Sequence, residues 1–317
     1  MTTAAQLLAP PPATPQARAV QFATGFDPLD LAIGGFRAHD LAIVGGRPGV
    51  GKTVVALQWA RQMAMCGQTV VYAGYDHTPA ALVRRLLAIE LRSLARPDEL
   101  SGLPGLRALA EEVVLGAVPL QALTAEPLGE EATLRLREYG SRIHLVRPAT
   151  GSSGVAGLAR LVTEHRSDAT ALIVDSIQQV APHRTALDST AHTDHVVAQL
   201  KDLAMVAEIP VIGVSGVDHA GLTARRVQLH HLEGASALAH EADVVILLND
   251  KRDVVAPHAG GDGSERWTVF SIEKHLEGAA DLHLEFRQDL ANFRFDPAGG
   301  FVTGDFAAAT PLDLGVK

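Results

Sequence analysis

The segment over residues 43–59 places a lysine and a hydroxyl side chain directly after a glycine-rich stretch. It reads IVGGRPGVGKTVVALQW, so Gly46 and Gly51 enclose four residues and are followed by Lys52 and Thr53. Glycines let backbone N–H groups converge on phosphate oxygens, and the N-terminus of a following helix favours an anion. In this pattern the lysine reaches the β- and γ-phosphates and the threonine coordinates Mg²⁺. The spacing therefore predicts an ATP-binding loop formed by Gly46, Arg47, Pro48, Gly49, Val50, Gly51, Lys52 and Thr53.

Two aspartates that end predicted strands could complete this site. Asp175 follows the apolar run ALIV, and a carboxylate there could support Mg²⁺ because parallel strands bring their ends beside the bound phosphates. Asp76 follows the strand predicted over residues 68–75, where it could orient or deprotonate an attacking water. Each aspartate could instead be a turn residue. For Asp76 the residues alone leave both interpretations open.

The elements that must position these side chains alternate between strands and helices. Strands are predicted over residues 40–46, 68–75, 142–146, 170–176, 210–215 and 243–249, and helices over residues 53–65, 77–95, 152–166 and 192–208. Pro and Gly interrupt residues 96–140, which predict short helices. Residues 266–275, 280–286 and 292–296 predict an antiparallel meander. The sequence thus predicts an α/β fold with a mainly parallel twisted sheet, flanking helices and an antiparallel C-terminal extension.

The composition restricts the class of protein and its surroundings. The net charge is −9, which argues against a general nucleic-acid binder but leaves room for a local basic strip or a basic ring channel. Cys66 is the only cysteine, so the chain has no disulfide framework. No apolar run approaches the ~18 residues of a membrane span, and the first residues lack the features of a signal peptide. We therefore expect a cytoplasmic location and no membrane partner.

Two pairs of histidines are candidates for a metal site. His192 and His195 are three residues apart, and His230 and His231 are adjacent. Neither pair has a matching set of carboxylates or thiols in the nearby sequence, as a metal site would need. Solvated or capping histidines are therefore favoured over metal ligands.

Taken in order, the motifs resemble the RecA/KaiC/DnaB group, and above all the C-terminal motor domain of DnaB-like replicative hexameric DNA helicases. The resemblance rests on TGFDPLDLAIGGF at residues 24–36, the phosphate-binding loop, and LIVDSIQQV at residues 172–180. It implies a RecA-like P-loop ATPase domain over residues 22–303. Before this domain, the Ala/Pro-rich composition of residues 1–21 predicts a disordered arm or linker, and residues 304–317 form a tail after it. ATP and Mg²⁺ are the implied cofactors.

Matched position by position, the resemblance implies further roles and partners. Asp175 would support Mg²⁺, Asp76 would activate water, Gln178 would couple the nucleotide to DNA-facing loops, and Lys274 would reach the γ-phosphate of a neighbouring subunit. The implied partners are further copies of the chain in a hexameric ring and single-stranded DNA. A short Pro-rich arm stands where the family has a helical N-terminal domain, and a protein could bind through this arm. In such a ring the basic pair Arg225–Arg226 could touch a phosphate backbone, although a solvated loop is the simpler interpretation.

The chain departs from the family pattern at positions that affect catalysis. Asp76 stands where the family has Glu, Gly216 where it has Gln, and Leu276 where it has Arg. An arginine finger contributes roughly 10³–10⁵ in rate where it operates, and Leu276 cannot replace it. Two interpretations therefore stay open: an ATPase working on DNA in a ring, or a nucleotide-binding regulatory or scaffold module with little or no hydrolysis. A small-molecule kinase is disfavoured because the sequence shows no obvious lid or acceptor site.

Overall fold

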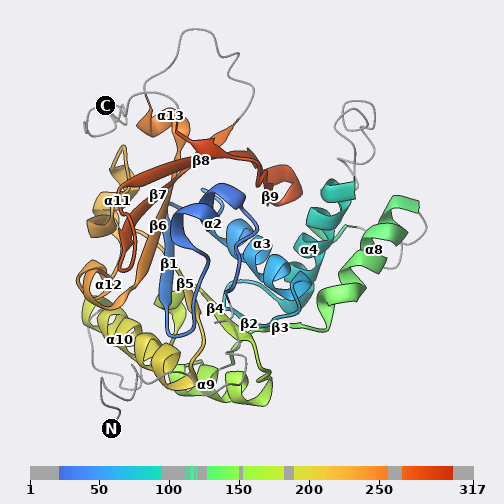
Figure 1. Cartoon of the computed structure of the whole chain (residues 1–317), viewed down its shortest axis with the longest axis horizontal. Helices are drawn as coiled ribbons and strands as arrows, with labels where there is room; N and C mark the ends of the chain where they lie inside the picture. Colours follow the sequence, from blue (N-terminus) through green and yellow to red (C-terminus); the bar gives the residue numbers. More distant parts are fainter. Residues whose placement is uncertain are drawn as a thin grey trace, which may run out of the picture.

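The computed structural model describes residues 21–94, 127–149, 153–181, 189–255 and 266–302, with a few further positions between 112 and 119. Apart from Gln21, the arm expected over residues 1–21 lies outside the described residues, and so does the tail expected over residues 304–317. Most of the segment for which short helices were predicted also lies outside them. Figure 1 shows the described elements arranged around one twisted sheet.

In the described part of the chain, ten strands form one sheet in the order β10-β8-β7-β6-β1-β5-β4-β2-β3, with β9 paired to β8. Six neighbouring strands run parallel: β3 (Ile143–Val146), β2 (Thr69–Gly74), β4 (Thr170–Asp175), β5 (Val211–Ser215), β1 (Leu41–Gly46) and β6 (Val244–Asp250). The antiparallel part consists of β7 (Trp267–His275), β8 (Leu282–Asp289), β9 (Arg294–Phe295) and β10 (Gly300–Phe301). The predicted fold class is confirmed.

Helices cover both faces of the sheet, which is why the parallel strands are continuous apolar runs. One face carries α2 (Asp27–Ile33), α3 (Lys52–Met65), α4 (Pro79–Leu94) and α8 (Pro127–Gly140), and the other carries α9 (Val155–Glu164), α10 (Ser189–Ala207) and α12 (Ala235–Glu241). Along β1, Ala42 and Val44 pack into the first core, whereas Leu41 and Ile43 pack into the second. This alternation follows from the two-residue period of a strand.

Local signals set the start of α4 where the sequence predicted it. The hydroxyl of Thr78 accepts a hydrogen bond of 3.2 Å from the N–H of Ala81, and α4 begins at Pro79. Thr78 is therefore the N-cap, with proline at the first helical position. One helix of 14 residues, α8, occupies the end of the segment for which short helices were predicted, so that prediction is wrong there.

Gln58 of α3 holds the antiparallel extension against the parallel core. Its amide donates to the carbonyl of Phe295 at 2.9 Å and accepts from the N–H of Phe295 at 2.7 Å, and the side chain is 8% exposed. β9 therefore pairs with a glutamine side chain in addition to its partner strand β8. This contact fixes Phe295 beside the phosphate-binding loop, which the next section describes.

The Gln58→Ala variant is expected to lower the free energy of unfolding by about 2 kcal/mol, because two buried backbone groups of Phe295 lose their partner. Urea denaturation followed by circular dichroism measures the change. The matched control is Gln62→Ala, one turn further along α3, where the amide contacts the sulfur of Cys66 at 3.5 Å. Equal stability losses in the two variants would contradict the prediction.

Candidate nucleotide-binding site

The glycine-rich turn forms in the expected strand–turn–helix context, between the end of β1 at Gly46 and the start of α3 at Lys52. Gly51 has φ 104°, in the left-handed region that favours glycine. A Cβ at this position would lie 2.5 Å from the ring of Phe295. Gly46 is equally restricted, because a Cβ there would lie 2.7 Å from the carbonyl oxygen of Leu248. Glycine is therefore required at both ends of the turn.

A cavity of about 370 Å³ opens beside this turn at the N-terminus of α3. Its lining residues come from the turn, α3, the connection between β2 and α4, α4 itself and the connection between β8 and β9: Gly49, Gly51, Lys52, Thr53, Val54, His77, Arg85, Leu290 and Phe293. Thr53 thus faces the space in which the sequence placed Mg²⁺ and phosphate. A Cβ at Gly49 would meet nothing within 4 Å, so this part of the turn is open to a ligand.

The Lys52 ammonium lies over the turn that it was predicted to serve. Its Nζ donates to the carbonyl of Gly46 at 2.7 Å and to that of Arg47 at 2.9 Å. Burial lowers the pKa of Lys52 to about 8, and the Asp175 carboxylate acts in the opposite direction. Lys52 is therefore a cation near neutral pH that can lose its proton under mildly alkaline conditions.

ATP affinity is expected to fall above pH 8, by about tenfold for each pH unit, because only the protonated Lys52 attracts phosphate and its pKa is about 8. The affinity is fully present below that pKa and is lost as the pH rises through it. Titration of a fluorescent ATP analogue between pH 7 and about pH 9.5 measures the effect. An affinity that stays constant over this range would contradict the assignment of Lys52.

Asp175 ends β4 and lies buried beside the phosphate-binding loop. Its Oδ2 accepts a hydrogen bond of 2.7 Å from the hydroxyl of Tyr72, and its side chain is one of the charges that act on Lys52. Hydroxyl and carboxylate oxygens are the ligands that Mg²⁺ prefers, so Thr53 and Asp175 form a suitable donor set. Tyr72 holds the orientation of the carboxylate.

Asp76 is exposed just after the end of β2, next to the strand that carries Asp175. The N–H of Tyr75 donates to the carbonyl of Asp175 at 2.8 Å, so the two strand ends are held together. The amide of Gln179 donates to the Asp76 carboxylate in a short contact. The structure brings Asp76 to the same edge of the sheet as the phosphate-binding loop, but Asp76 does not line the 370 Å³ cavity.

Gln178 contacts the end of β5 and does not line the cavity. Its Nε2 donates to the hydroxyl of Ser215 at 2.9 Å, and its Oε1 accepts from the N–H of Gly216 at 3.2 Å. This side chain therefore joins the segment after Asp175 to the start of the connection between β5 and β6. Its predicted part in nucleotide binding stays a prediction.

Lys274 lies at the opposite edge of the sheet from the phosphate-binding loop. It pairs with Val245 near the beginning of β6, whereas Gly46 pairs with Leu248 further along β6. Its ammonium donates to the carbonyls of Ala239 and His240, at 2.7 and 3.2 Å, near the end of α12. The structure therefore does not bring Lys274 to the site of its own chain, and its role towards a neighbouring chain stays a prediction.

The cavity is also lined by residues that sequence reasoning did not single out, among them Arg85, His77 and Phe293. The Arg85 guanidinium lies over the ring of Phe293 at 4.7 Å, a cation–π distance. Burial lowers the pKa of His77, and the Arg85 charge lowers it further. The sequence did carry a signal for a basic side chain here, because Arg84 and Arg85 are adjacent on a helix that is otherwise amphipathic. Nothing local in the sequence indicated Phe293.

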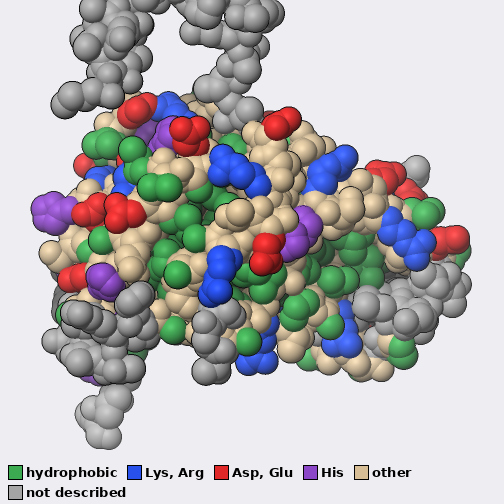
Figure 2. Space-filling view, turned by 90° about the horizontal axis from the view of Figure 1, so that it is seen from below, with side chains coloured by type: hydrophobic (Ala, Val, Ile, Leu, Met, Phe, Trp, Pro, Cys, Tyr) green, Lys and Arg blue, Asp and Glu red, His purple; other side chains and the backbone are tan. Residues whose placement is uncertain are grey.

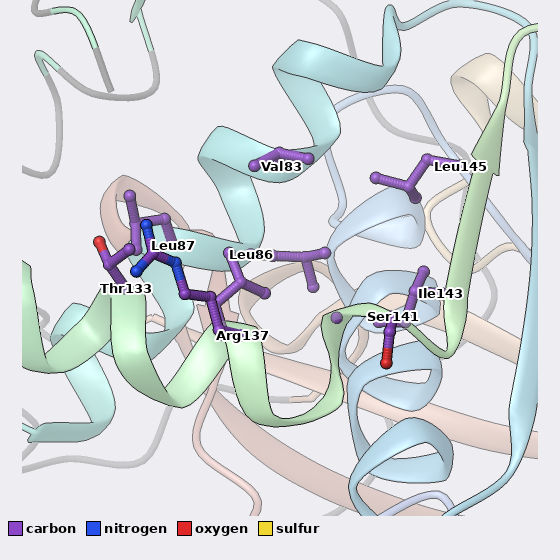
Figure 3. A pocket seen from close by; sticks show the side chains of 10 residues that line it. Val83, Leu86, Leu87, Thr133, Arg137, Ser141, Ile143 and Leu145 are labelled. Carbon is purple, nitrogen blue, oxygen red and sulfur yellow. The ribbon is translucent and has the colours of Figure 1, made fainter. Parts of the chain in front are cut away.

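A larger cavity of about 550 Å³ lies between α4 and α8, beside β3 (Figure 3). Leu86, Leu87 and Ile143 give it an apolar lining, and none of the predicted site residues reaches it. Among the described residues there is no group of three His, Cys, Asp or Glu side chains that could hold a metal ion. The search for membrane spans, which covered the same residues, found no helix with the length and apolar character to cross a bilayer.

A parallel sheet that carries a phosphate-binding loop at its carboxyl edge, with a buried aspartate two strands away, defines a RecA-like P-loop NTPase. Residues 21–96 and 144–295 match the model of the DnaB-like helicase C-terminal domain. The chain belongs to this family.

One relative agrees with this assignment, and two solved structures share the fold. The chain is 30% identical over 245 residues to the replicative DNA helicase DnaB of Rhodothermus marinus, a match that covers 73% of this chain and 23% of that protein. A solved ATPase domain superposes with a TM-score of 0.68 at 15% identity, covering 89% of this chain and 92% of that one. A DnaB-like replicative helicase studied for its interactions with primase gives a TM-score of 0.69 at 16% identity, covering 89% and 62%.

Proposed function

We propose that the chain binds ATP with Mg²⁺ at the phosphate-binding loop and hydrolyses it. The observation that supports this most directly is the convergence of Lys52, Thr53 and the buried Asp175 at one edge of the sheet. The turn N–H groups and Lys52 would bind the β- and γ-phosphates. Thr53 and Asp175 would hold Mg²⁺, which neutralises charge on the phosphate oxygens when it is bound.

Asp76 is the residue we assign to the attacking water. Its carboxylate is exposed at the edge of the site and is oriented by Gln179. A carboxylate in this position accepts a proton from water as the oxygen attacks the γ-phosphorus. Aspartate is one methylene shorter than the glutamate implied by the resemblance, so we expect slow hydrolysis.

The proposal also includes assembly of the chain into a ring and binding of DNA. We propose a ring in which Lys274 of each copy faces the γ-phosphate held by the next copy, with single-stranded DNA as the polymer on which the ring acts. The position of Lys274 away from its own site is consistent with such a role in trans. A protein partner bound through the N-terminal arm is part of the same proposal.

The alternative function is a nucleotide-binding regulatory or scaffold module with little or no hydrolysis. Leu276 is 68% exposed directly after β7, where the resemblance implies an arginine finger. Gly216 supplies only its backbone to Gln178. On the face shown in Figure 2, basic, acidic and histidine side chains are mixed among the described residues, so this face offers no uniformly basic track for DNA.

The two functions are separated by the rate of ATP hydrolysis with and without single-stranded DNA. For a DNA-dependent ATPase, we expect a measurable rate that rises when DNA is added. A near-zero rate under both conditions, with ATP still bound, would favour the module. Light scattering with ATP and Mg²⁺ tests the ring, and a monomer under all conditions would remove the role of Lys274 in trans.

A further inference from the structure

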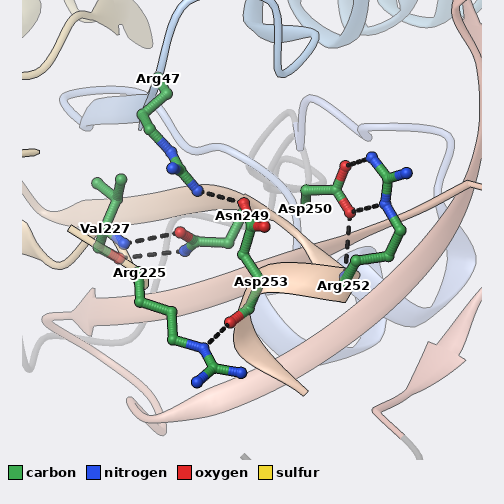
Figure 4. A network of polar contacts seen from close by, with 7 residues as sticks. All are labelled: Arg47, Arg225, Val227, Asn249, Asp250, Arg252 and Asp253. Carbon is green, nitrogen blue, oxygen red and sulfur yellow. Dashed lines mark hydrogen bonds and ion pairs between the residues drawn. The ribbon is translucent and has the colours of Figure 1, made fainter. Parts of the chain in front are cut away.

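An ion pair joins the phosphate-binding loop to a neighbouring element. It is formed by the side chain of Arg47, which has no assigned role in binding the nucleotide. Arg47, the first residue after Gly46, extends towards β6, and its Nη2 lies 2.5 Å from Oδ2 of Asp253. The two side chains are only 19% and 31% exposed, so the pair is better shielded from solvent than a typical surface ion pair. Figure 4 shows Arg47 reaching across to Asp253.

The position of Asp253 is fixed by the sheet, because its short helix, α13 (Lys251–Val254), directly follows β6. The Asp250 side chain caps this helix by accepting from the N–H of Arg252 at 3.0 Å. On its other side, Val254 packs with Val269 of β7 in a small separate core. A change in the position of Arg47 is therefore transmitted to a packed element.

The same segment also holds the stretch between β5 and α12, which includes the short helix α11 (His219–Thr223) and is here called the β5–β6 loop (residues 216–234). The Nε of Arg225 donates to the backbone carbonyl of Asp253 at 2.6 Å. Two residues along, Val227 is bound by the buried side chain of Asn249, which accepts from its N–H at 2.7 Å and donates to its carbonyl at 3.1 Å. Asp253 thus contacts the phosphate-binding loop through its side chain and the β5–β6 loop through its backbone (Figure 4).

A second link from the site to the β5–β6 loop is made at the loop's first residue. Gln178 bonds there to the N–H of Gly216, which has no side chain to extend towards a nucleotide. The route through Asp253 begins with the ion pair between the side chains of Arg47 and Asp253, and Arg47 belongs to the phosphate-binding turn itself. The Arg47–Asp253 route is therefore better placed than the Gln178–Gly216 link to respond when phosphate binds.

We propose that Asp253 is a positioning residue that couples nucleotide binding at the phosphate-binding loop to the conformation of the β5–β6 loop. The proposal rests on the nucleotide site proposed above. Lys52 now donates to the carbonyls of Gly46 and Arg47, and bound phosphate would compete for these same ammonium protons. The backbone of Arg47 then loses a partner, its side chain shifts against Asp253, and Arg225 follows. Nucleotide therefore favours one arrangement of the β5–β6 loop over another.

Hydrogen exchange of the full chain tests this coupling, measured on peptides from residues 217–233 with and without a saturating non-hydrolysable ATP analogue. In the wild type we expect the analogue to change exchange in this loop. In Asp253→Ala and in Arg225→Ala we expect that change to shrink by at least about fivefold while the analogue still binds. Asp253→Asn removes the charge but keeps an acceptor oxygen for Arg47, so its response should lie between those of the wild type and Asp253→Ala. If Asp253→Ala folds poorly, Arg225→Ala serves as the variant that breaks the route. The Arg47→Ala/Asp253→Ala double variant should lose no more than Asp253→Ala.

Arg252→Ala is the matched control, because it removes another ion pair from the same helix, with Asp250, that touches neither loop. It should respond to the analogue as the wild type does. Coupling through Asp253 is overturned if Asp253→Ala keeps the full response at saturation, if the control loses it, or if the saturated wild type shows none. If the wild type binds no analogue at all, the proposed nucleotide site fails as well, and a direct binding titration distinguishes that case.

Discussion

Replacing Lys52 with alanine is expected to weaken ATP binding by about 100-fold, or about 3 kcal/mol. The side chain lies over the turn, where its ammonium donates to the carbonyls of Gly46 and Arg47. In the nucleotide complex these protons serve the β- and γ-phosphates, and alanine removes a protein cation that shares their neutralisation with Mg²⁺. Titration of a fluorescent ATP analogue against both proteins measures the difference.

Two further variants show whether the loss comes from the charge. Lys52→Met keeps most of the side-chain length without the ammonium, so its affinity should match that of the alanine variant. Arg252→Ala removes a cation that is 56% exposed and pairs only locally with Asp250 in the described structure, so it should bind as the wild type does. Equal affinity of wild type and Lys52→Ala would refute the nucleotide site.

Exchanging Asp175 for asparagine is expected to lower the rate of ATP hydrolysis by about 10- to 100-fold. Asparagine has nearly the shape of aspartate, and its amide oxygen can still accept from the hydroxyl of Tyr72. The change therefore removes negative charge at the proposed Mg²⁺ position with little change in packing. A Mg²⁺ titration of the hydrolysis rate should show a weaker dependence in the variant.

The Tyr72→Phe variant separates the charge of Asp175 from its orientation. It removes the 2.7 Å hydrogen bond but leaves the carboxylate in place. We expect a smaller loss of rate than in Asp175→Asn, with the Mg²⁺ dependence retained. If Asp175→Asn hydrolyses ATP at the wild-type rate with unchanged Mg²⁺ dependence, Asp175 has no role in the metal site.

Much of the fold could be predicted because its signals are local. The apolar runs that became β1, β4 and β6 are buried on both faces, and their length and β-branched content indicated strands. Thr78 and Pro79 marked the start of α4 for the same reason, since a cap acts within one turn. The 14-residue α8 was mistaken for short helices because glycine and proline at its ends were taken as interruptions.

In the candidate site, too, the contiguous parts could be predicted from the sequence and the long-range contacts could not. The phosphate-binding loop is contiguous, so its residue types and spacing were sufficient to place Lys52 and Thr53 beside one cavity. The strand ending at Asp175 was recognisable, but its partner Tyr72, which is 103 positions away, was not. Arg85 and Phe293 meet over the cavity from α4 and the β8–β9 connection, and no periodicity in the sequence relates them.

The sequence by itself therefore determined the α/β class, the phosphate-binding loop and the family, because each depends on the order and spacing of residues along the chain. Only the tertiary structure decided which distant groups meet. Arg47 and Asp253 are 206 positions apart, and Gln58 and Phe295 are 237 apart. Such pairs form where strand order and register bring β1, β6 and the antiparallel extension together. That packing is a property of the whole sheet, and no single segment of the sequence carries it.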